Sequence, residues 1–207
     1  MIIDFNKKLD IMIPNAKCEL NYNKDYELLL ATVLSAQCTD KRVNEVTKVL
    51  FKYDLNDLIK IDIKEIEDII RPCGSYTKKA LYIKEIANKL VNECNGKVPN
   101  NREYLESLPG VGRKTTNVVL SNLFDVPAIA VDTHVERVSK RLRLANKNDD
   151  VVVVEKKLMK KIPEYLWSKS HHQLVLFGRY ICKARNPLCD DCLFYDDCKF
   201  KDKKKIS

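Results

Sequence analysis

Four closely spaced cysteines near the C-terminus constrain this 207-residue chain more than any other feature. Cys182, Cys189, Cys192 and Cys198 form the pattern C-x6-C-x2-C-x5-C in a segment rich in residues typical of loops. Structural zinc usually uses two close Cys pairs, and this segment has only one. The short spacing between Cys189 and Cys192 lies between two longer ones. This arrangement suits the cubane of an iron–sulfur cluster, whose iron corners lie on different sides. We expect a metal centre here, with an iron–sulfur cluster favoured over zinc.

The redox state of the cellular compartment determines whether the cysteines of this chain form disulfides. Residues 1–8 carry early charges without an apolar run of signal-peptide length, and no stretch approaches the length of a membrane span. We therefore expect a protein of the reducing cytoplasm that has no membrane partner and no disulfides. The other four cysteines, Cys18, Cys38, Cys73 and Cys94, are scattered and are interpreted as small buried hydrophobic residues.

The charge balance is moderately basic, with 37 Lys and Arg against 29 Asp and Glu. A net charge of +8 favours a phosphate backbone as partner. The alternative is a Lys-rich proteome, because Lys, Asn and Ile are all abundant here. Charge alone leaves both interpretations open.

Apolar residues recur with a helical period along nearly the whole chain, which predicts an all-α fold. One expected helix stops at Pro72 and a longer one ends at Gly96. Val151–Val154 is the only strand-like run, and the Glu-Lys-Lys-Leu after it favours a helix. Further helices are expected over Arg102–Leu108, Lys114–Leu123, Thr133–Arg143, Val151–Ile162 and His171–Cys182.

Two of only five glycines lie two residues apart between expected helices. Gly110, Val111, Gly112 and Arg113 follow a helix ending near Leu108 and lead into the next one. Such a turn leaves backbone N–H groups free at a helix N-terminus, where they suit a DNA phosphate. The alternative is an ordinary αα-hairpin whose glycines serve the turn alone.

Lys114 and Asp132 are the candidate catalytic residues. A Lys in the first turn of a helix lies at the positive end of the helix dipole, which disfavours its charge and favours the nucleophilic neutral amine. Asp132 stands in the sequence Val-Asp-Thr-His, where the next helix begins. The alternative interpretation of Lys114 is a solvated Lys that contacts phosphate. Capping of that helix is the alternative role for Asp132.

With these motifs in the same order, the chain resembles endonuclease III over nearly its whole length. The resemblance lies in Leu34–Gln37 with Thr39–Asp40, Glu106–Thr115, Ala130–His134, His171–His172, Gly178–Tyr180 and the four-cysteine spacing.

The resemblance implies two helical modules. Residues 19–126 would form a six-helix barrel with a helix-hairpin-helix motif near 102–123, and residues 1–18 with 127–207 would form an iron–sulfur cluster module. One [4Fe–4S] cluster would be held by Cys182, Cys189, Cys192 and Cys198. Lys114 would be the nucleophile and Asp132 its carboxylate partner.

The resemblance also implies the reaction. The protein would be a monomeric DNA glycosylase and abasic-site lyase that excises oxidised pyrimidines from duplex DNA. Gln37 would probe the gap left by a flipped nucleotide, while Lys183 and Arg185 beside the cluster loop would contact phosphates. The alternatives are a non-catalytic DNA-binding module, an electron carrier, or a relative of the adenine-specific mismatch glycosylases, which usually lack a Lys at the position of Lys114.

One departure from the family lies at Gly74-Ser75-Tyr76, where members often read Gly-Leu-Tyr. The Leu inserts into the DNA stack, and Ser75 has no apolar bulk with which to do so.

Overall fold

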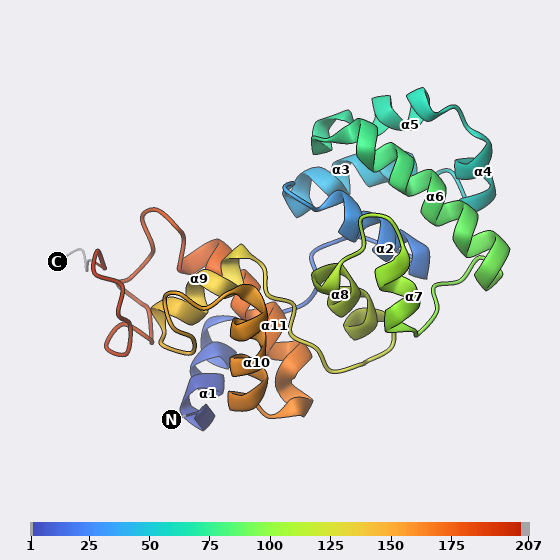
Figure 1. Cartoon of the computed structure of the whole chain (residues 1–207). Coiled ribbons are helices and arrows are strands. Elements are labelled where there is room, and N and C mark those ends of the chain that lie inside the picture. Colours follow the sequence, from blue (N-terminus) through green and yellow to red (C-terminus); the bar gives the residue numbers. More distant parts are fainter. Residues whose placement is uncertain (1, 204–207) are drawn as a thin grey trace. The chain divides into compact units, whose positions relative to one another are not determined.

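The computed structural model describes residues 2–203, and this part of the chain contains helices and loops but no strand, which confirms the all-α class (Figure 1). The chain divides into two compact units. One consists of residues 19–124 and is called the continuous unit here; the other joins residues 1–18 to 125–207 and is called the terminal unit. Within residues 2–203 no helix combines the length and apolarity needed to cross a membrane.

The continuous unit is built around α2, whose residues from Tyr26 to Leu34 are all buried. A helix that is apolar on every side belongs inside a fold, and α2 packs against α3, α6 and α8. The long α6 also packs on α4 and α5. The elements of this unit are α2 (Asp25–Leu34), α3 (Asp40–Leu50), α4 (Leu55–Lys60), α5 (Ile63–Ile70), η1 (Arg71–Cys73), α6 (Tyr76–Cys94), α7 (Arg102–Ser107) and α8 (Arg113–Leu123).

The helix ends in this unit follow local sequence. Thr39 caps α3 by accepting a hydrogen bond from the backbone of Arg42, and Asp62 caps α5. The chain leaves α5 just before Pro72, as expected, and continues as the short 3₁₀ turn η1. Gly96, with φ +74°, donates its amide to the Leu90 carbonyl and ends α6.

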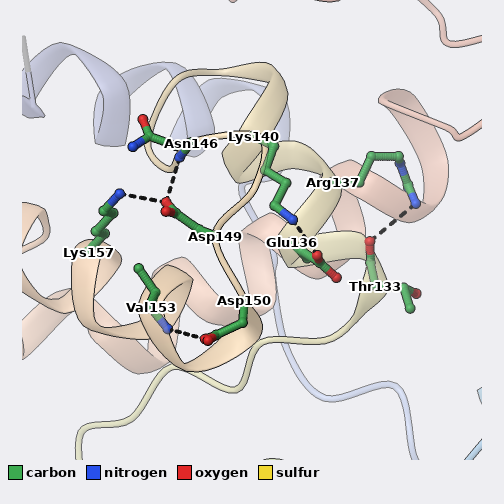
Figure 2. A network of polar contacts seen from close by, with 9 residues as sticks. All are labelled: Thr133, Glu136, Arg137, Lys140, Asn146, Asp149, Asp150, Val153 and Lys157. Atoms are coloured by element: carbon green, nitrogen blue, oxygen red, sulfur yellow. Dashed lines mark hydrogen bonds and ion pairs between the residues drawn. The ribbon is translucent and has the colours of Figure 1, made fainter.

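The terminal unit brings the two ends of the chain together. Its elements are α1 (Ile2–Met12), α9 (Thr133–Arg141), α10 (Val151–Lys161), η2 (Glu164–Leu166), α11 (Trp167–Leu176) and η3 (Phe177–Ile181). α1 packs on α11, and Leu9 joins Val135, Val138 and Phe177 in one buried core. The loop before α10 is tied down by Asp149, which accepts hydrogen bonds from the backbone of Asn146 and from Lys157, both at 2.6 Å (Figure 2).

Two segments of the terminal unit test the helix boundaries expected from the sequence. The strand-like Val151–Val154 opens α10, where Asp150 accepts a hydrogen bond from Val153 N as the N-cap (Figure 2). The helix expected over His171–Cys182 begins earlier, at Trp167, and widens at Phe177 into the π-helical η3. η3 lies close against α9, since a Cβ on Gly178 would come within 2.8 Å of His134 Cβ.

Candidate functional site

The helical hairpin formed by α7, α8 and the loop between them is the first part of the site (Figure 1). Leu108 and Val111 anchor the loop in the core, at 2% and 4% exposure, and the Val111 amide donates to the Leu108 carbonyl. Gly110 has a φ of +74°, a left-handed conformation that favours glycine. Gly112 is different, because nothing lies within 4 Å of the position that a Cβ would take there.

The N-terminus of α8 is open. Gly112 occupies the N-cap position and no side chain caps the helix. The first amides of an α-helix have no partner within the helix, and the helix dipole adds positive potential at the same end. Arg113 and Lys114 form the start of the helix and are both exposed. The hairpin thus combines amides that have no partner within the helix, open space at Gly112 and positive charge, which suits an anion such as phosphate.

Asp132 is the N-cap of α9. Its Oδ1 accepts hydrogen bonds from the backbone amides of His134 and Val135, both at 2.8 Å. These two bonds confirm the capping role that the sequence left as an alternative, and they fix the orientation of the carboxylate. Capping does not conflict with a chemical role, because both bonds end on one of the two carboxylate oxygens. Asp132 lies in the terminal unit and Lys114 in the continuous unit.

All four cysteines of the C-terminal pattern line one cavity of the terminal unit. Cys182 follows η3, and backbone turns such as Cys192 N to Cys189 O and Cys198 N to Phe194 O bring the rest of the segment around it. Within the described residues, no three Cys, His, Asp or Glu side chains stand close enough together for a single metal ion. Four thiolates spread around a cavity match the donor set of a cubane, whose iron corners lie on different sides.

The guanidinium of Arg141 supports this cavity from α9. It donates to Cys182 Sγ at 3.3 Å and to the carbonyls of Lys183 at 2.7 Å and Ala184 at 3.1 Å. Its guanidinium carbon lies 3.7 Å from the centre of the Phe200 ring. Burial raises the pKa of the Cys182 thiol, and the hydrogen bond and charge of Arg141 oppose that rise. Arg141 thus favours the thiolate, the form that binds iron.

Arg137 lies one turn earlier on α9, and its guanidinium binds backbone carbonyls of η3 and of Cys182. It donates to the carbonyls of Gly178 at 2.7 Å and Cys182 at 3.2 Å, and more weakly to that of Thr133 (Figure 2). Sequence reasoning missed both arginines. Their spacing of four residues on one helix face was the available signal, but it is equally common on exposed faces.

The remaining candidate DNA contacts lie on exposed loops. Lys183 and Arg185 are exposed directly after Cys182. Gln37 and Ser75 are exposed in the continuous unit, after α2 and before α6, and both have positive φ, of 57° and 46°. Non-glycine residues seldom adopt this conformation, and those that do often lie at functional sites.

Comparison with known proteins agrees with this site. Residues 30–164 match the HhH-GPD superfamily of base excision DNA repair proteins, and residues 182–198 match the iron-sulfur binding domain of endonuclease III. Endonuclease III of Bacillus subtilis is 48% identical, over 93% of this chain and 89% of the relative. Endonuclease III of Escherichia coli is 40% identical, over 97% and 98%. A solved structure of a trapped endonuclease III–DNA covalent intermediate has a TM-score of 0.91 and 48% identity, and covers 96% of both chains.

The fold, the hairpin and the cysteine cavity together define a helix-hairpin-helix protein of base excision DNA repair. The chain belongs to the endonuclease III family. It is an enzyme, a DNA glycosylase and abasic-site lyase, and it carries a [4Fe–4S] cluster.

Proposed function

We propose that this enzyme excises oxidised pyrimidines from duplex DNA and cleaves the abasic site that remains, with Lys114 as nucleophile and Asp132 as its carboxylate partner. The observation that carries the proposal is the position of Lys114 in the first turn of α8. This helix follows the hairpin loop directly, and no side chain caps its N-terminus. A phosphate bound by the hairpin amides would bring the sugar-phosphate backbone to this residue. The trapped covalent complex of a relative with 48% identity also supports a nucleophilic side chain.

The reaction begins once the damaged nucleotide has left the base stack, which costs least for a damaged pair. The lone pair of the Lys114 amine attacks C1′, the bond from C1′ to the base breaks, and the base departs with the bonding electron pair. Asp132 stabilises the positive charge that develops on the sugar and assists proton transfer. Opening of the sugar ring gives an imine between Lys114 and C1′.

The imine makes the C2′ proton acidic, so a base can remove it. The electron pair forms a double bond between C2′ and C3′, and the 3′ phosphate leaves with its oxygen. Water then hydrolyses the imine and returns the Lys114 amine.

In this scheme the segment that carries the four cysteines, residues 182–198, binds phosphates of the DNA backbone. When bound, the cluster supplies four iron–thiolate bonds that cross-link Cys182, Cys189, Cys192 and Cys198. Arg141 holds the carbonyls of Lys183 and Ala184, so the exposed basic loop keeps a defined shape. We propose that Lys183 and Arg185 contact the duplex backbone there, and that the enzyme acts as a monomer in the cytoplasm.

Borohydride trapping on a lesion-bearing duplex tests the role of Lys114, because only an imine becomes a stable covalent link. Lys114→Gln and Lys114→Arg should both abolish trapping and base excision. Lys114→Arg keeps the positive charge, so its affinity for the duplex should stay close to that of wild type. Lys97→Gln, which changes an exposed Lys in the loop after α6, should trap normally.

The same assay separates the alternatives. A mismatch glycosylase that works without an imine would excise a base but would never trap. If Lys114→Gln still traps, another amine is the nucleophile and the assignment is wrong.

A further inference from the structure

Lys79 is a buried lysine of the continuous unit that the reaction does not use. Only 5% of its surface is exposed, although it lies in α6 directly after the exposed Lys78. Its Nζ donates three hydrogen bonds to backbone carbonyls: Leu34 at 2.9 Å, Ala36 at 2.8 Å and Cys73 at 2.8 Å. A lysine ammonium has three N–H donors, so all of them are used.

The acceptors belong to two separate segments of the chain. Leu34 is the last residue of α2 and Ala36 follows it by two, while Cys73 ends η1. The last carbonyls of a helix have no partner within the helix and carry its negative dipole end. A cation placed there is stabilised by both segments at once, which offsets the cost of removing the ammonium from water. That cost still lowers the pKa of Lys79.

Each segment leads straight into a residue with unusual backbone geometry. Gln37 follows Ala36 and has φ 57°, and Ser75 lies two residues after Cys73 with φ 46°. Both side chains are exposed. The Cys73 thiol interacts with the thiol of Cys38 in the other segment, and burial together with this interaction raises the pKa of Cys73 to about 12.

We propose that Lys79 is a positioning residue whose ammonium group joins the segment of Gln37 to that of Ser75, so that both enter a damaged duplex as one rigid unit. The inference rests on the proposed function in assigning these two loops to the DNA. Three carbonyls bound to one charged group leave little freedom for either loop to move alone. The loops are therefore set for insertion before DNA arrives, and ordering them costs little on binding.

Amide hydrogen exchange of the free, cluster-loaded enzyme tests the connection without DNA. Lys79→Met keeps the apolar stem and removes all three donors, and Lys79→Gln is a milder change that keeps two donors on a shorter side chain. Lys78→Met is the matched control, since it removes the same charge one residue earlier from an exposed position. We expect faster exchange at residues 35–38 and at residues 71–76 in Lys79→Met, smaller increases in Lys79→Gln, and none in the control.

Faster exchange at residues 71–76 alone would overturn the proposal, because a residue that only stabilised the start of α6 would affect its own neighbourhood and not the end of α2. Unchanged exchange in both segments would overturn it as well. If Lys79→Met does not fold, Lys79→Gln decides between the same outcomes.

A second measurement tests whether the joined loops recognise damage. The affinity for a duplex with a tetrahydrofuran abasic-site analogue is compared with that for an undamaged duplex of the same sequence. In Lys79→Met the ratio of the two affinities should be about tenfold lower than in wild type. Its affinity for the undamaged duplex should stay within about twofold of the wild-type value. An unchanged preference despite loosened loops would overturn the positioning role. A wild-type enzyme without any preference would instead contradict the proposed function, and hydrogen exchange would still decide whether Lys79 joins the loops.

Discussion

Tyr82 lies against Gly110, in the space that the Cβ of any other residue would need. A Cβ built on Gly110 would come within 2.5 Å of Tyr82 Cδ2 and 2.8 Å of Cε2. Gly110 also has a φ of +74°, whereas neither constraint applies to Gly112. The two glycines of the hairpin are therefore needed for different reasons. Gly110 allows the turn to form and to pack on α6, and Gly112 leaves the entrance to the α8 amides open.

Alanine substitutions should separate these two reasons. Gly110→Ala should lower the free energy of unfolding by about 2 kcal/mol or more, from left-handed strain and contact with Tyr82. Gly112→Ala should lower it by no more than about 1 kcal/mol, the cost of Ala at an N-cap, yet weaken binding to an abasic-site duplex by holding phosphate away from the amides. Urea unfolding and equilibrium binding measure both quantities. Equal losses of stability in the two variants would contradict this division.

The hairpin, the cysteine pattern and the helix caps could be predicted because each is a local pattern with one dominant physical cause. Lys79 and Arg141 could not, because their roles depend on carbonyls 43 and 41 residues away in the chain. In the sequence Lys79 is one of two adjacent lysines in a helix and resembles any solvated residue. The widening of the helix at Phe177 was missed for a similar reason, since it accompanies the close approach of Gly178 to His134.

Asp132 has both a capping and a proposed chemical role, and two substitutions distinguish them. Asp132→Asn keeps an oxygen that can accept from the amides of His134 and Val135, so α9 should remain stable. It removes the negative charge, so single-turnover base excision should fall by at least tenfold. Asp132→Ala should lose the same activity and also about 1 kcal/mol of stability. If Asp132→Asn excises at the wild-type rate, capping is the only role of this residue.

Arg141 should control how firmly the cysteine segment retains its cluster. Arg141→Gln removes the charge near Cys182 Sγ and most of the hydrogen bonds to the Lys183 and Ala184 carbonyls. We expect the variant to lose iron faster than wild type when a chelator is added. The loss is measured by the decrease in visible absorbance of the cluster. The outer contacts of metal ligands typically contribute 10- to 100-fold in affinity, so a change of about tenfold in rate is expected. Lys147→Gln, at an exposed position in the same unit, is the control. Equal rates of iron loss in both variants would contradict the role of Arg141.

His172 should make the stability of the terminal unit depend on pH. Burial lowers the pKa of its ring in the folded protein. As the pH falls below about 6.5, the unfolded chain binds a proton that the folded chain does not, so stability decreases. In His172→Gln this contribution is absent, and the free energy of unfolding should fall less steeply between pH 7.5 and 5.5. The difference in slope can reach about 1.4 kcal/mol per pH unit. Parallel curves for wild type and variant would show that His172 does not titrate in this way.

Gln37 and Ser75 are expected to differ in importance for lesion recognition. A flipped nucleotide leaves a hole about one base wide, and filling it offsets part of the lost stacking. Gln37 is long enough to enter that hole and its amide can hydrogen-bond the unpaired partner base. Ser75 is small, and its side chain forms no capping hydrogen bond to α6. Gln37→Ala should therefore cost at least a few-fold in activity, whereas Ser75→Ala should be nearly neutral.

Replacing Ser75 by Leu tests whether the loop before α6 can still insert an apolar side chain between bases. Because the side chain of Ser75 is exposed, Leu at this position has room to project and can bury apolar surface between bases. Ser75→Leu should improve binding to a lesion duplex by up to about 1 kcal/mol. Affinity and single-turnover excision on one lesion duplex measure all three variants. If Ser75→Ala is as damaging as Gln37→Ala, the loop of Ser75 fills the hole by its backbone and Gln37 is not the main probe.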